Sequence, residues 1–279
     1  MTTTTDIPAL VLATNDEPRE AAAFAFTAAE ARQTCRSVRL VHVVHGSTPR
    51  GPQHPLTYSW EEVEAEGARL LHHARERLEA VADGPVHVTT EVVRGRVVHR
   101  LLAVSADASS LVLSGRGLPR HTPRSGVSAA LAGRAICPVV SVPRSWRPED
   151  GFVRRVVLAL GDLEHPGRLV GHAFELAAAH AAPLLVVHVA DRRPVDQQQV
   201  EGATTSFRDR FPHVEVTHEV VEGSPEERLL QVRDPRDLLV VGRRDASHPV
   251  YEHLGSLTRT LLQSSTVPLV VVPRPQDAH

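Results

Sequence analysis

Lysine is absent from this chain of 279 residues, so all 31 of its basic residues are arginine. A P-loop needs a lysine that reaches the phosphates of a nucleotide, and a Schiff base needs the amine of a lysine. The sequence therefore excludes both kinds of chemistry.

Cysteine and aromatic residues are scarce as well. The two cysteines, Cys35 and Cys137, supply neither a disulfide framework nor the paired spacing of a zinc site. Cys35 falls in an alanine-rich segment and Cys137 precedes an apolar run, so we expect both to be small buried side chains. Aromatic residues make up 4% of the chain, which disfavours stacking on single-stranded nucleic acid.

Long apolar runs and an excess of one charge are also missing. No stretch approaches the roughly 18 apolar residues of a membrane span, and the first residues lack the features of a signal peptide. Hydrophobic residues make up 42% of the chain, charged residues 23%, and the formal net charge is -2. We expect a soluble cytoplasmic protein with no membrane or nucleic-acid partner.

Short apolar segments alternate with helical segments in the first half of the chain. Strands are predicted at 10–13, 38–44, 86–93, 110–113 and 138–142. Helices are predicted between them, at 17–36, 61–82, 97–105 and 127–134. This alternation is typical of a parallel sheet with helices on both faces.

The second half of the chain repeats the first. His42 and His188 stand in similar apolar segments 146 positions apart, whereas Gly95 and Gly223 stand in similar segments 128 positions apart. The decrease in this offset from 146 to 128 positions means that the first copy has extra residues after its second strand. We assign them to the segment 45–60. A repeat that keeps its register through all five strand-like segments indicates duplication.

The repeat also fixes the expected domains. Pro138 and Pro268, which open the last apolar segments of the two halves, are 130 positions apart. We predict a first domain at residues 1–146 and a second at 152–279, each of ordinary domain size. The linker between them is rich in proline and charge.

Seventeen histidines raise the question of a metal site. They are scattered and show none of the ligand spacings of zinc proteins, so we predict no metal site. His42 and His188 occupy equivalent places in the repeat, which suggests a shared structural role such as holding a loop backbone.

The stretch Asp237–Thr258 combines a strand, a glycine turn and a helix. An apolar run ends at Gly242, and Gly255 and Ser256 open a predicted helix at 257–263. The first backbone N–H groups of a helix have no partner within the helix, and they favour an anion. The pattern therefore fits a phosphate site, but it also fits a plain strand–loop–helix connection.

With the repeat laid out, the chain resembles a tandem universal stress protein. The most specific segments are VVEGSPEERLLQVRDPRDLLVVGRR and HLGSLTRTLLQSSTVPLVVVPRP, which occupy 220–244 and 253–275. The resemblance implies two tandem doubly wound domains, each with a five-stranded parallel sheet flanked by helices, like the adenine-nucleotide alpha hydrolases. Many members of that family bind ATP and others bind no nucleotide; the ligand crevice lies at the carboxyl ends of the strands.

The family's phosphate motif is a glycine, two residues, a second glycine, nine residues, and then glycine followed by Ser or Thr. The second half keeps this spacing from Gly242 to Ser256, but Asp245 stands at the second glycine. A carboxylate repels phosphates unless Arg243 or Arg244 offsets its charge or Mg²⁺ bridges it to them.

The first half departs from the motif in another way. Ser114 replaces the first glycine, Gly117 keeps the second, and the loop to Ser125 and Gly126 is shorter. This loop carries arginines and no acid, so an anion site and a solvated basic loop are both open readings.

The resemblance implies a set of nucleotide-contacting residues in each domain. In the second domain they are Gly161, Asp162, Val189, Gly242, Arg243, Asp245, Gly255, Ser256, Leu257 and Thr258. In the first domain they are Asn15, Val43, Gly117, Ser125, Gly126 and Ser128. Of these, Val43 and Val189 match positions that pack on adenine, although both would be apolar in any sheet.

We therefore expect a stress-response protein that binds ATP, at least in the second domain, where the motif spacing survives. No nucleophile elbow with a matching Asp and His occurs, so we expect no enzymatic activity beyond a slow ATP hydrolysis. The alternative is a nucleotide-free interaction or regulatory module with degenerate sites. The last strands would let the two halves pair within the chain, and a homodimer of chains is a further option.

Overall fold

The computed structural model describes residues 8–44, 59–115, 126–147, 153–163, 165–190, 195–243 and 254–274. The elements of the first half are β1 (Leu10–Ala13), the 3-10 helix η1 (Pro18–Glu20), α1 (Ala21–Gln33), β2 (Val38–Val44), α2 (Trp60–Val81), β3 (Val88–Arg94), α3 (Val97–Val104), β4 (Ser110–Gly115), α4 (Val127–Ala132) and β5 (Val139–Pro143). Those of the second half are β6 (Arg155–Ala159), α5 (Gly167–Ala179), β7 (Leu184–Ala190), α6 (Gln197–Gly202), α7 (Thr205–Arg210), β8 (Val216–Glu222), α8 (Pro225–Leu229), β9 (Asp237–Gly242), α9 (Ser256–Ser264) and β10 (Leu269–Val272).

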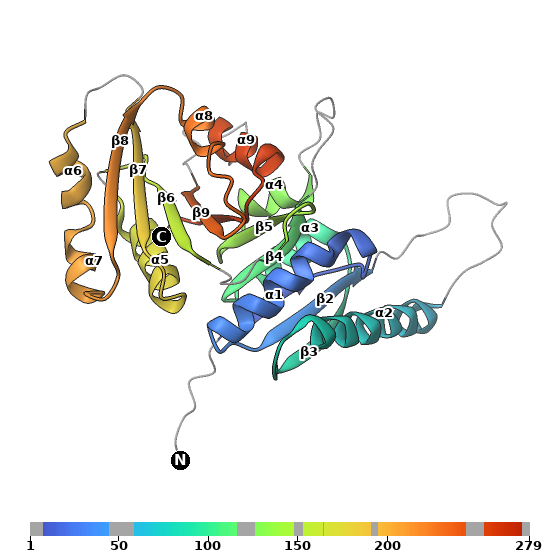
Figure 1. Cartoon of the computed structure of the whole chain (residues 1–279). Helices are drawn as coiled ribbons and strands as arrows, with labels where there is room; N and C mark the ends of the chain where they lie inside the picture. Colours follow the sequence, from blue (N-terminus) through green and yellow to red (C-terminus); the bar gives the residue numbers. More distant parts are fainter. Residues whose placement is uncertain are drawn as a thin grey trace, which may run out of the picture.

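All these strands belong to one sheet of ten strands in the order β3-β2-β1-β4-β5-β10-β9-β6-β7-β8 (Figure 1). Each half has its strands in the order 3-2-1-4-5, and neighbours within a half are parallel. The strand order reverses between β1 and β4, and again between β6 and β9. Such reversals are where α/β sheets open a crevice at the carboxyl ends of their strands. The predicted fold of two doubly wound domains is confirmed.

The two halves meet at β5 and β10, which pair antiparallel, with Val140 opposite Val270. The strands of the second half therefore run opposite to those of the first. As a result, the carboxyl ends of the two sets of strands lie at opposite edges of the common sheet.

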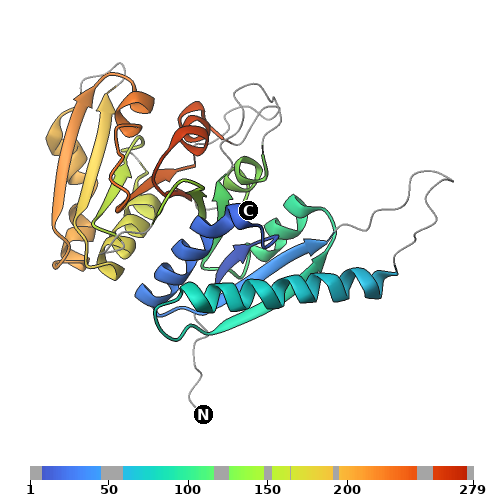
Figure 2. The same ribbon diagram turned by 45° about the vertical axis from the view of Figure 1, so that its right-hand side comes forward.

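Helices cover both faces of this sheet (Figure 2). One apolar cluster joins α1 and α2 of the first half to α5 of the second, through side chains such as Phe24, Leu71 and Phe174. The other joins α3 and α4 to α8 and α9, through side chains such as Leu101 and Leu261. The strands alternate between the two clusters, since Leu10 belongs to the first and Val11 to the second.

Two sequence-based expectations need correction. The extra residues of the first copy do not all fall in 45–60: α2 is a continuous helix of 22 residues, whereas its counterpart is two short helices, α6 and α7. Cys35 is exposed rather than buried, because it follows the end of α1 in a turn where its φ is 51°. Cys137 is buried as expected.

The predicted role of the paired histidines is confirmed. Nδ1 of His42 donates to the carbonyl oxygen of Thr14 at 3.0 Å, and Nδ1 of His188 donates to that of Leu160 at 2.7 Å. Each histidine thus fixes the chain just beyond the first strand of its half. This is the point at which the crevice of a doubly wound domain begins.

The halves also touch away from the paired strands. Nε2 of His180, at the end of α5, donates to the carboxylate of Glu30 in α1 at 3.0 Å, and both side chains are buried. Beside them, the amide of Gln33 donates to the carbonyl oxygen of Ala179 at 3.0 Å. The indole of Trp146 donates to the carbonyl oxygen of Pro235 at 2.6 Å. Each of these bonds joins one half to the other.

Candidate functional site

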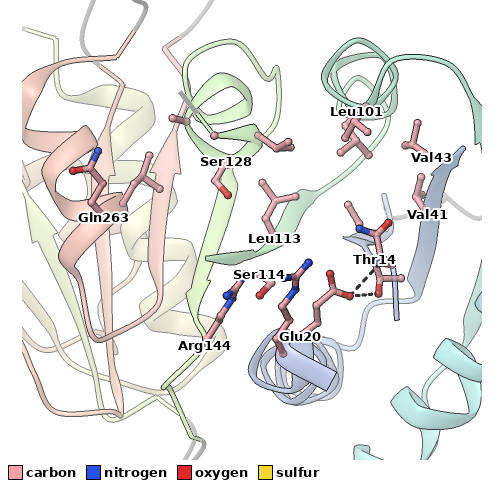
Figure 3. Close-up of a pocket in the computed structure, with 18 of the residues that line it drawn as sticks. Thr14, Glu20, Val41, Val43, Leu101, Leu113, Ser114, Ser128, Arg144 and Gln263 are labelled. Atoms are coloured by element: carbon pink, nitrogen blue, oxygen red, sulfur yellow. Dashed lines mark hydrogen bonds between the residues drawn. The ribbon is translucent and has the colours of Figure 1, made fainter. Parts of the chain in front are cut away.

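A pocket opens at the crevice of the first half (Figure 3). It is lined by the carboxyl ends of β1, β2 and β4, by α3 and α4, and by α9 of the second half. Its volume is about 160 Å³. The position is the one that the strand order predicts for a ligand.

One end of this pocket is apolar. Val41 and Val43 of β2 and Leu101 of α3 form its wall, and Figure 3 shows them on the same side of the pocket. A flat apolar group such as a nucleobase gains free energy from burial against a wall of this kind.

The other end is polar and basic. Arg144, Ser114 and Ser128 lie on this side in Figure 3, and Arg19 and Arg259 also line the pocket. Within the described part of the chain, the Oγ of Ser114 and the Nε of Arg144 are buried atoms without a hydrogen-bond partner. Buried polar atoms are normally satisfied. Arg144 as a whole is only partly buried, so its guanidinium can donate to a ligand in the pocket that it lines.

An acidic side chain borders the pocket at the end of β1. One carboxylate oxygen of Glu20 accepts from the hydroxyl of Thr14 at 2.6 Å and from the backbone N–H of Asn15 at 3.1 Å. Glu20 therefore closes the turn between β1 and η1 through one carboxylate oxygen, and its carboxylate is part of the pocket lining.

The first-domain residues expected from the sequence fall into two groups. Asn15, Val43, Gly126 and Ser128 line the pocket together. Gly117 and Ser125 lie outside the described residues, so their predicted role is untested.

The aspartate next to this site faces away from it. Asp16 has a φ of 53°, and its carboxylate accepts from Arg77 of α2 at 3.0 Å. The turn therefore presents Asn15, rather than Asp16, to the pocket.

The corresponding turn of the second half is arranged differently. Asp162, which is the repeat counterpart of Asp16, accepts from the guanidinium of Arg274 at 2.5 Å. Gly161 stands at the place of Asn15, and a Cβ added to it would meet no atom within 4 Å. Val189 is the next-to-last residue of β7, as Val43 is of β2.

The predicted phosphate turn of the second half contacts an acidic side chain of α8. Gly255 caps α9 with φ -65° and ψ 162°, and the hydroxyl of Ser256 donates to the carboxylate of Glu226 at 3.4 Å. Of the next two residues, Leu257 is partly buried against the apolar cluster and Thr258 is buried. The carboxylate brings negative charge to the turn where a phosphate was expected.

The remaining predicted residues surround the end of β9. Gly242 is packed closely, since a Cβ there would lie 3.0 Å from the side chain of Leu169. Arg243 donates to the carbonyl oxygen of Ala135 in the first half at 2.9 Å. Asp245 lies outside the described residues, so its effect on phosphates stays a prediction.

Arg144 and Arg274 are repeat counterparts, one residue beyond β5 and two residues beyond β10. In the second half the arginine is neutralised by Asp162. In the first half the counterpart Asp16 pairs with Arg77 instead, and Arg144 lines the pocket without an ion pair to any residue that the structure describes. The two crevices therefore differ in how this arginine is paired.

Sequence reasoning missed Arg144, Arg19, Arg259 and Gln263 as pocket residues. Arg144 had a signal, because it follows Pro143 as Arg274 follows Pro273 in the repeat. The two α9 residues had none, since their place in a first-half pocket depends on how β5 and β10 pair.

The described residues offer no group of three or more His, Cys, Asp and Glu that could hold a metal ion. Within the same part of the chain, no helix is long and apolar enough to cross a membrane.

Two doubly wound halves in one chain, each with parallel strands whose order reverses at a switch point, define a tandem Rossmann-like α/β protein. A model of the universal stress protein family matches residues 8–143 and again 153–273. The chain belongs to the universal stress protein family.

Two relatives agree with this assignment, and a solved structure shares the fold. Universal stress protein Rv1996 of Mycobacterium tuberculosis is 28% identical over 222 residues, which cover 72% of this chain and 70% of the relative. Universal stress protein Rv3134c of the same organism is 30% identical over 197 residues, covering 67% and 70%. The crystal structure of a universal stress protein from Archaeoglobus fulgidus covers 95% of this chain and 98% of its own, with a TM-score of 0.75 and 16% identity. The last likeness shows the fold alone.

Proposed function

We propose that this universal stress protein binds an adenine nucleotide, ATP, in the pocket of its first domain and acts without enzymatic turnover. The observation that carries the proposal is Arg144. It lines the pocket with a buried Nε that has no partner among the described residues, whereas its counterpart Arg274 is paired with Asp162.

The two ends of the pocket suit the two ends of a nucleotide. The base would pack on Val41 and Val43, and the phosphates would lie toward Arg144 and Ser128. Arginine is the side chain best suited to phosphate, because its planar guanidinium donates two parallel hydrogen bonds to the phosphate oxygens. The ribose would then lie near Asn15, which lines the same pocket.

The motif spacing alone favoured the second domain. The contacts of Ser256 with Glu226 and of Arg274 with Asp162 favour the first instead, because they place a carboxylate at one phosphate position and neutralise the arginine at another. We therefore assign the principal site to the first domain. Binding by the second domain is the alternative that the experiment tests.

The test is calorimetric titration with ATP and with adenosine, each with and without Mg²⁺. Replacing Arg144 by Gln removes a charge-assisted hydrogen bond of about 1.5–3 kcal/mol, which corresponds to about a 10- to 100-fold weaker affinity for ATP. Adenosine, which has no phosphate, should bind the variant and the wild type equally. Arg274→Gln is the matched control, and it should leave both affinities unchanged.

A result in which Arg274→Gln weakens ATP binding and Arg144→Gln does not would move the site to the second domain. No heat with either ligand, together with no nucleotide released on denaturing the freshly purified protein, would favour the alternative, a nucleotide-free interaction module. A change of ATP affinity with Mg²⁺ would show that the ion enters with the phosphates.

We further propose that the chain works in the cytoplasm with its two domains joined through β5 and β10. The alternative to a single chain is a homodimer of such chains. Light scattering on the purified protein separates a particle of 30.4 kDa from one of twice that mass.

A further inference from the structure

We propose that the second domain supplies part of the first domain's nucleotide site, and that α9 faces the phosphate chain of the ligand. This inference rests on the proposed function. It adds that the second domain affects the affinity for a nucleotide, and that this effect increases with the charge of the nucleotide.

The lining of the pocket carries the first step of the inference. Arg259, Leu262 and Gln263 belong to α9 of the second half, yet all three line the pocket of the first half. Figure 3 shows Gln263 on the helix that borders the pocket, on the side opposite Val41 and Val43.

The strand pairing explains this arrangement. Because β10 is antiparallel to β5, its first residue, Leu269, lies opposite Ser141 near the carboxyl end of β5. The helix α9 leads directly into β10, so its last turn comes to the same edge of the sheet. That edge is the carboxyl end of the first domain, where Arg144 follows β5 and the crevice opens.

The polarity of the pocket gives the second step. Its apolar wall at β2 and α3 lies on the far side from α9, and its basic end, with Arg144, lies on the near side (Figure 3). A nucleotide whose base packs on the apolar wall must direct its phosphates toward α9. Longer phosphate chains should therefore come closer to Gln263 than adenosine does.

Gln263 offers a direct test because its side chain is neutral and exposed. A negative charge there should repel the phosphates, and a positive charge should attract them. In a partly solvated site, one added unit charge that lies within the Debye length of a bound polyanion changes the affinity about three- to tenfold at low salt. A structural disturbance would weaken binding in both variants, whereas the electrostatic effect has opposite signs.

The experiment measures the affinities of the full chain for ATP and adenosine by calorimetry at low salt, in Gln263→Glu and Gln263→Arg. We expect ATP to bind about three- to tenfold more weakly to the first and more tightly to the second, with adenosine unchanged. Ser264→Glu and Ser264→Arg are matched controls, because Ser264 is the exposed neighbour that does not line the pocket.

ATP affinities that follow the charge at 263 and not at 264 support the inference. Equal effects at both positions, or none at either, overturn it. If the wild type binds ATP and Arg144→Gln weakens that binding, such a result leaves the proposed function intact. If the wild type binds neither ATP nor adenosine, the proposed function fails, and this inference fails with it.

Discussion

The buried bond between His180 and Glu30 should contribute measurably to the stability of the chain. The two groups come from α5 and α1, they are 3.0 Å apart, and their side chains are 1% and 10% exposed. Replacing His180 by Leu leaves the carboxylate of Glu30 in this enclosed place without the ring that donates to it. Leaving a buried polar group unsatisfied costs about 1–3 kcal/mol, so we expect a loss of that size in the free energy of unfolding.

A double-mutant cycle separates this bond from packing. Glu30→Leu should also destabilise the protein, but the pair Glu30→Leu and His180→Leu should cost less than the two single changes together, because neither partner is then left behind. We expect a coupling energy of about 1–2 kcal/mol between the two positions.

The assay is urea unfolding followed by the fluorescence of Trp146, whose indole bonds to Pro235 of the other half at 2.6 Å. Trp60→Phe removes the second indole and keeps an aromatic ring under Arg94. Single substitutions that change stability by less than about 0.5 kcal/mol, or a coupling near zero, would refute the reasoning that this bond ties the two halves together.

Two further predictions concern single residues. Burial raises the pKa of the Cys137 thiol to about 12. At pH 8 a thiolate-specific reagent should therefore label the exposed Cys35 in the native protein, and should label both thiols only after unfolding. Rapid labelling of both thiols in the native protein would contradict this prediction. Gly115→Ala should destabilise the protein by about 1–3 kcal/mol, because a Cβ there would lie 2.9 Å from the carbonyl oxygen of Val142. Gly161→Ala is its control, since its Cβ meets nothing within 4 Å, and thermal melts that shift equally for the two variants would disprove the clash.

Much of the fold followed from the sequence because its signals are local. The apolar runs that became β1 and β2 have the predicted bounds, and the repeat placed His42 and His188 in equivalent roles. The greater length of α2 was not predicted, because the segment 45–60 has little periodicity and the whole difference in repeat length was assigned to it.

The site was harder to predict because it depends on contacts that are distant in sequence. Motif spacing gave Gly255 and Ser256, but it could not show that Glu226 of α8 comes within hydrogen-bonding distance of that serine. Likewise, Arg144 and Arg274 occupy equivalent positions in the sequence repeat. The structure distinguishes them, because Arg274 forms an ion pair with Asp162.

The most direct test of the account compares two equivalent valines. Val43 and Val189 stand near the ends of β2 and β7, and Val43 lines the pocket that we assign to adenine. Titration of ATP into Val43→Asp and Val189→Asp should show a loss of about tenfold or more in affinity for the first, and wild-type affinity for the second. Loss in Val189→Asp with retention in Val43→Asp would contradict the assignment of the site to the first domain.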